Sequence, residues 1–222
     1  MCFSPEADFV AAAVVGTIGV ATLRQVREPR ELIVGALPML FALHQFVEGF
    51  VWLSLRGQVS TGLGQAAIDV YVVYAYAVLP IIVPIGFWLI EPSPRHRRWI
   101  LPFIALGAVV GLYLLWHVTS HTVTATGHDA AISYATNIPE GYLAGIGYVI
   151  ATCAPALLSS RRYLQWFGVV NLVGVGVAAT VHRVEFASVW CLYAALASLL
   201  ILEHFRRQRR LDIRAEAVAV SA

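Results

Sequence analysis

Residues 31–55 read ELIVGALPMLFALHQFVEGFVWLSL, and this stretch decides the fold. A helix that crosses a membrane needs roughly 20 mainly apolar residues, and the stretch is long enough. It also contains His44 and Glu48, which are four residues apart and therefore share one face of a helix. An ionisable side chain inside the hydrocarbon layer marks a candidate functional site. A site at these two residues needs further side chains from elsewhere in the chain.

The composition of the chain predicts an integral membrane protein. Hydrophobic residues make up 59% of the 222 residues and charged residues 13%, whereas soluble domains contain about 25% charged residues. The mean hydropathy is +0.74. The net charge of +2 is small, and the arginines stand at predicted helix ends, which argues against a nucleic-acid partner. We expect a multi-pass protein of the inner (plasma) membrane whose main partner is the lipid bilayer.

Seven apolar segments are long enough to span a membrane, so the sequence predicts an all-α, polytopic helical bundle. Their approximate bounds are 5–24, 31–55, 65–90, 99–120, 137–159, 163–183 and 186–206. Ser4 is predicted to cap the first helix, and Asn137 the fifth, with Glu140 three residues later. Pro80 and Pro84 are predicted to break the third helix.

The arginines give the orientation of the bundle. Thirteen of the fifteen fall on one side of the seven segments, and only Arg56 and Arg183 fall on the other. By the positive-inside rule, the arginine-rich side is cytoplasmic. The sequence therefore predicts an N-terminus outside the cell, a transmembrane domain over residues 1–206 and a basic cytoplasmic tail over residues 207–222.

Titratable side chains converge on the predicted outer side of the membrane. At 1.5 Å per residue, His44 and Glu48 stand in the outer half of the second segment. The residues expected in this layer are Cys2, His44, Glu48, His117, His121, His182, Glu185 and Cys191. Carboxylates at helix starts are explained more simply, because they offset the positive end of the helix dipole. These are Glu6, Asp8, Asp69 and Glu140.

Histidine spacing makes metal binding the leading hypothesis for this layer. His117 and His121 are spaced as HxxxH, which puts two imidazoles on one helix face at the spacing a metal ion needs. With His44 and His182 as further nitrogen donors, the set suits zinc, or iron or copper. The alternative is a polar network in which Glu48 accepts hydrogen bonds and fixes the bundle.

Two acids and two cysteines complete the candidate site. Glu48 and Glu185 are the candidate catalytic carboxylates, with Glu48 as a ligand or as a general base for metal-bound water. Cys2 and Cys191 are further candidate ligands, or a disulfide pair in an oxidising compartment. Cys153 is expected to be an inert, packed thiol.

Short motifs along nearly the whole chain carry a family resemblance. They are MCFS at residues 1–4, LPMLFA at 37–42 leading to EG at 48–49 and Trp52, AT at 151–152 leading through Pro155 to SS at 159–160, and SVWC at 188–191. Together they resemble an uncharacterised family of small bacterial and archaeal membrane proteins that begin Met-Cys-Phe-Ser. The resemblance implies no activity.

The resemblance bears on the candidate residues. The family pattern carries glutamines where this chain has His44-Gln45, and often a tyrosine near His182. A metal site that uses these two histidines would therefore belong to this chain and not to the whole family. The family pattern also has a histidine near His121. The positions of this chain that match the family pattern are Cys2, Glu48, Trp52 and Cys191.

Alkaline ceramidases, which are seven-helix zinc hydrolases, share the predicted topology. Their HxxxH pair belongs to the last helix, whereas here it ends the fourth, so the similarity is an analogy of fold.

The sequence leaves three classes of function. The leading one is a metal-dependent hydrolase that acts on a lipid or lipid-soluble substrate in a polar pocket open to the outer leaflet. The second is a redox protein that holds haem or copper between histidines of facing helices. The third is a non-catalytic sensor, carrier or assembly subunit whose polar layer is structural. A transporter is disfavoured because the charges collect at one face.

Overall fold

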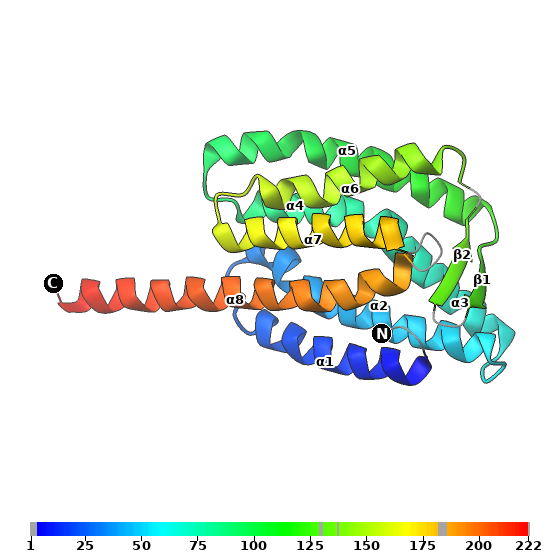
Figure 1. Ribbon diagram of the computed structural model, residues 1–222. Helices are drawn as coiled ribbons and strands as arrows, with labels where there is room; N and C mark the ends of the chain where they lie inside the picture. Colours follow the sequence, from blue (N-terminus) through cyan, green and yellow to red (C-terminus); the bar gives the residue numbers. More distant parts are fainter. Residues whose placement is uncertain (1–3, 129–130, 137, 182–185, 222) are drawn as a thin grey trace.

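The computed structural model describes residues 4–128, 131–136, 138–181 and 186–221, which form an up-and-down helical bundle with one β-hairpin (Figure 1). A short 3-10 turn, η1 (Pro29–Glu31), precedes the second helix. The third helix is continuous and consists of three parts. In order, the helices are α1 (Pro5–Leu23), α2 (Leu32–Leu55), α3 (Thr61–Val72) with the π-helical segment η2 (Val73–Val78) and α4 (Leu79–Ile90), α5 (Pro94–Ser120), α6 (Gly141–Leu157), α7 (Arg162–Val181) and α8 (Phe186–Ser221).

The described helices fit a membrane bundle. Four stretches are long and apolar enough to cross a membrane, namely Pro5–Leu23, Pro29–Leu55, Thr61–Ile90 and Pro94–Ser120, and α6 is a shorter apolar helix. Large apolar side chains are exposed on the outer faces of several helices, among them Val10, Leu43, Val109, Leu112, Ile146 and Leu172. Extended exposed apolar surface of this kind is rare on soluble monomers.

Serine caps set the starts of three helices. Ser4 caps α1 as predicted, because its hydroxyl accepts a hydrogen bond of 3.2 Å from the Ala7 N–H. Ser60 and Ser93 cap α3 and α5 in the same way. Both helices therefore begin four or five residues before the predicted apolar runs.

The predicted start of the fifth helix, directly after a cap at Asn137, is wrong, although Asn137 itself lies outside the described residues. Helix α6 begins at Gly141, directly after Glu140, whose φ of 48° lies in the left-handed region. Pro139 explains the difference, because a residue that precedes proline is disfavoured in a helical conformation.

The prediction that Pro80 and Pro84 break the third helix is also wrong, since the helix runs unbroken through η2 and α4. Pro80 has no N–H to offer to the carbonyl four residues earlier. The π-helical segment lies immediately before it, and there the Leu79 N–H bonds to the Tyr74 carbonyl, five residues back. Membrane helices tolerate proline where such local adjustments satisfy the backbone.

Two glycines bring α5 against the backbone of this irregular helix. A β-carbon at Gly107 would stand 1.9 Å from the Pro80 carbonyl oxygen, and one at Gly111 would stand 2.7 Å from the Ala77 carbonyl oxygen. Pairs of small residues four apart allow this close approach between membrane helices. The Pro80 carbonyl is also one that lacks a helical donor, because residue 84 is a proline.

The hairpin departs from the all-α prediction. Strands β1 (Thr124–His128) and β2 (Ala131–Ala135) pair antiparallel between α5 and α6, in the stretch that lies between the predicted segments 99–120 and 137–159. Its apolar residues alternate, so Val123 and Ile132 are almost fully buried against Trp52 and Tyr71. A second core cluster lies toward the opposite end of the bundle and includes Leu37, Phe87, Leu164, Ile201 and Phe205.

Candidate functional site

The described candidate residues His44, Glu48, His117 and His121 lie toward one end of the bundle, called here the hairpin end. Helices α1, α3, α6 and α8 begin there, α2, α5 and α7 end there, and both strands lie there (Figure 1). The opposite end, where the arginines stand, is called the arginine end. The convergence of candidate residues on one end therefore follows from the up-and-down order of the helices.

His44 lies in a stack of aromatic rings from three elements. Its imidazole stacks on the Tyr71 ring of α3 at 3.9 Å between centroids, and the Tyr74 ring lies 4.7 Å away. Tyr71 in turn stacks on Tyr134 of β2 at 4.7 Å. The Nδ1 atom of His44 is buried and has no hydrogen-bond partner among the described residues. A buried polar atom without a partner costs about 1–3 kcal/mol.

Glu48, one turn after His44, is fully buried, as is Asp8 of α1. The two helices are in close contact at this depth, because a β-carbon at Gly49 would stand 2.6 Å from the Phe9 ring. Asp8 was expected to be a simple dipole-capping residue, but full burial distinguishes it from Glu6, which is exposed and pairs with Arg56. Buried carboxylates are rare unless they are paired or functional.

His117 and His121 lie at the end of α5. Their rings are nearly parallel with centroids 6.2 Å apart, and the Tyr113 ring lies 4.6 Å from His117. The Nδ1 atom of the exposed His121 is 3.1 Å from the His117 carbonyl oxygen, to which it donates within its own helix. His44 instead belongs to the tyrosine stack, so the two predicted histidine groups have different immediate surroundings.

Within the described part of the chain, no three His, Cys, Asp or Glu side chains form a group that could hold a metal ion. Cys2, His182 and Glu185 lie outside the described residues, as does the side chain of Cys191. The full predicted ligand set therefore stays a prediction.

The sequence reading missed the role of the π-helical segment beside His44. Tyr148 of α6 donates a hydrogen bond of 2.8 Å to the Ala75 carbonyl inside η2. π-Helical turns are frequent at functional sites, and this one carries Tyr74 to the His44 ring. The signal in the sequence was Pro80, which removes the N–H that the Tyr76 carbonyl would otherwise receive.

Two polar networks at the arginine end were also missed. In the first, the buried Glu91 accepts hydrogen bonds from the Ser159 hydroxyl at 2.8 Å, from the Ser160 hydroxyl at 2.5 Å and from the N–H groups of Ser160 and Ser93. Burial raises the pKa of Glu91, but the hydrogen bonds from Ser160, Ser93 and Ser159 together outweigh it and hold the pKa below its usual 4.5. This carboxylate joins the α4–α5 and α6–α7 connections.

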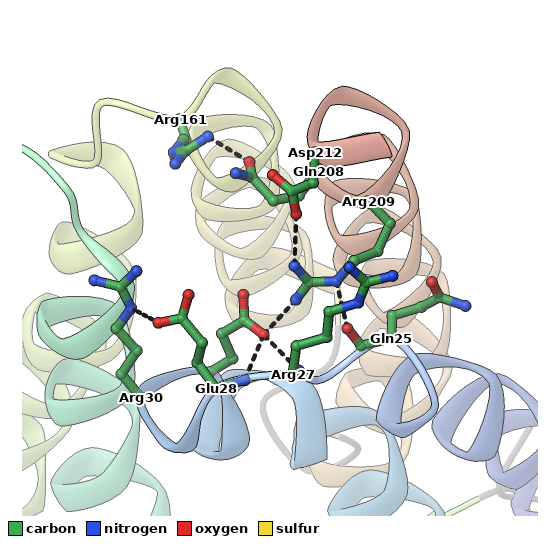
Figure 2. A network of polar contacts seen from close by, with 9 residues as sticks. Gln25, Arg27, Glu28, Arg30, Arg161, Gln208, Arg209 and Asp212 are labelled. Carbon is green, nitrogen blue, oxygen red and sulfur yellow. Dashed lines mark hydrogen bonds and ion pairs between the residues drawn. The ribbon is translucent and has the colours of Figure 1, made fainter. Parts of the chain in front are cut away.

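The second network is centred on Arg209 of α8 (Figure 2). Its guanidinium donates to the Gln25 carbonyl at 2.6 Å, to Asp212 at 2.8 Å and to Glu31. Glu31 also accepts from the backbone N–H groups of Arg27 and Glu28. Arg209 therefore links α8 to the α1–α2 connection through hydrogen bonds and an ion pair. Beyond it, α8 continues to Ser221 past the rest of the bundle, so the predicted tail is largely helical (Figure 1).

Comparison with known proteins tests the resemblance. No curated protein and no solved structure matches the chain, and the analogy to alkaline ceramidases is unsupported. A family model described as a family of unknown function, DUF6629, matches residues 1–217. The prediction of an uncharacterised family is confirmed: the chain belongs to the DUF6629 family of unknown function.

Proposed function

We propose that this chain is a seven-span protein of the plasma membrane, with its N-terminus outside and its arginine end in the cytoplasm. Four candidate spans and the shorter apolar α6 support the membrane location. Helices α7 and α8 bring the number of up-and-down helical passes to seven (Figure 1). The thirteen arginines at one end support the orientation.

We propose further that the hairpin end binds a metal ion, zinc foremost, through His44 and Glu48. One observation carries this proposal: the buried Nδ1 atom of His44 lacks a hydrogen-bond partner among the described residues, one turn from a fully buried carboxylate. Coordination would offset the cost of burying that nitrogen, and imidazole and carboxylate are both zinc ligands. The set of metal ligands would be completed by other predicted ligands, namely Cys2, His182 and Cys191.

A metal ion in this position would supply hydrolytic chemistry by lowering the pKa of a bound water molecule. Glu48 would help to hold the metal ion, and the tyrosine stack around His44 would fix the orientation of the imidazole. Because the surrounding helices have apolar outer faces, the expected substrate is a lipid or another lipid-soluble molecule.

Metal content tests the proposal. Purified wild-type protein should carry stoichiometric metal by elemental analysis, and His44→Ala and Glu48→Gln should each lose most of it. His96→Ala is the matched control, because His96 lies at the arginine end with its Nδ1 atom 2.8 Å from the Ser93 hydroxyl. Metal-free wild-type protein whose thermal unfolding is unchanged by a chelator would contradict metal binding.

The same preparation separates the alternatives. A Soret band in the absorption spectrum would favour a haem protein over a zinc hydrolase. If His44→Ala and Glu48→Gln lower stability while no metal is present in any variant, the buried layer is structural, as expected for a sensor, carrier or assembly subunit.

A further inference from the structure

The arginine end carries far more positive charge than its own carboxylates use. Thirteen arginines stand there, against five carboxylates whose side chains the structure describes. Each of these five is already engaged inside the protein: Glu28 with Arg30, Glu31 and Asp212 with Arg209, Glu203 with Arg207, and Glu91 with Ser159 and Ser160.

Many of the remaining arginines are exposed and have no carboxylate partner among the described residues. Eight of them are exposed and are not within ion-pair distance of any described carboxylate: Arg24, Arg27, Arg95, Arg98, Arg162, Arg206, Arg210 and Arg214. They come from the ends or connections of several helices and are therefore spread over this end of the bundle. A surface of this kind attracts anions from its surroundings.

Aromatic side chains place this charge at the depth of lipid headgroups. The guanidinium of Arg97 lies 4.0 Å from the Trp88 ring centroid, that of Arg207 lies 4.5 Å from Tyr163, and that of Arg95 lies 4.8 Å from Trp99. Trp99 is itself 45% exposed. Tryptophan and tyrosine concentrate where a membrane meets water, which is also where lipid phosphates lie.

We infer that the exposed arginines of this end bind the phosphate headgroups of anionic phospholipids and select such lipids for the layer around the protein. Guanidinium matches phosphate with two parallel hydrogen bonds, so arginine is well suited to this role. Because the five described carboxylates of this end already have partners in the chain, they do not compete for the exposed arginines. The inference rests on the membrane location but not on metal binding at the hairpin end.

Lipid preference in nanodiscs tests this inference with the full chain. The wild-type protein in nanodiscs of mixed phosphatidylglycerol and phosphatidylcholine should retain phosphatidylglycerol preferentially when its bound lipids are counted by native mass spectrometry. The combined variant Arg24→Gln, Arg98→Gln, Arg162→Gln should lose at least about tenfold in relative phosphatidylglycerol affinity, since each arginine near the surface contributes about fivefold. The preference should weaken at high salt.

The control is Arg56→Gln at the hairpin end, where Arg56 is exposed beside Glu6. It should retain the wild-type preference, and the circular dichroism spectra of all variants should match. Equal retention of the two lipids by the wild-type protein would overturn the inference. So would competition by inorganic phosphate at low millimolar concentration, which would identify a site for free anions, or an equal loss in Arg56→Gln.

Discussion

The hydroxyl of Tyr148 donates a hydrogen bond of 2.8 Å to the carbonyl of Ala75, across 73 positions of sequence. The acceptor lies in the π-helical segment that presents Tyr74 to His44. A residue of α6 therefore supports the irregular backbone on which the candidate site rests.

Tyr148→Phe should lower the free energy of unfolding by about 1–3 kcal/mol, because it leaves a buried carbonyl without its donor. Denaturant unfolding in detergent micelles measures this loss. The control is Tyr142→Phe, since Tyr142 is 81% exposed on the same helix. Equal stability of the two variants would show that the π-helical segment does not depend on this bond.

Gly107→Ala should destabilise the protein by about 2 kcal/mol or more, because the added β-carbon would collide with the Pro80 carbonyl oxygen and helices α4 and α5 would have to separate. Gly145→Ala in α6 is the matched control, with no described atom within 4 Å of its added β-carbon. It should leave stability unchanged or raise it by up to about 1 kcal/mol. Thermal unfolding of both variants decides the matter, and a neutral Gly107→Ala would refute the close approach.

Glu91→Gln should cost about 2 kcal/mol at neutral pH, since it removes a buried charge that accepts several hydrogen bonds. The pKa of Glu91 is lowered in the folded protein, so its contribution is complete above pH 4.5, the ordinary value, and is lost as the pH falls through the folded pKa. Unfolding measured from pH 7 down to pH 3 should therefore show the difference between wild type and variant shrink. Glu28→Gln at an exposed site is the control. A difference that does not shrink at all as the pH falls below 4.5 would argue against a charged Glu91.

Arg209→Ala should destabilise the bundle by about 3 kcal/mol, because Glu31 would keep its charge in a nearly buried place without its cation. Arg210→Ala, at the next position, removes an exposed arginine and should change stability by no more than about 0.5 kcal/mol. Hydrogen exchange should also quicken in residues 25–31 of the first variant alone. Indistinguishable variants would mean that the contacts of Figure 2 do not hold α8.

The sequence predicted the parts of this protein that depend on local composition. These parts are the apolar runs, the serine before α1, and the separation of most arginines from the candidate histidines along the predicted helices. Each of them can be read from residues that are neighbours in the chain. They were enough to place His44, Glu48, His117 and His121 toward one end of an up-and-down bundle. The predicted cap at Asn137 failed for a local reason too, because Pro139 disfavours a helical conformation at the residue before it.

Only the tertiary structure decided how these pieces are joined. The hairpin packs on α2 and α3 because those helices offer an apolar surface, which Val123, Ile132 and Tyr134 cover. Glu91 is a structural carboxylate because serines 68 and 69 positions away donate to it. The composition of the chain indicates which side chains are buried away from water. A hydrogen bond or a ring stack requires two groups in a fixed geometry, and only the fold brings distant residues into that geometry.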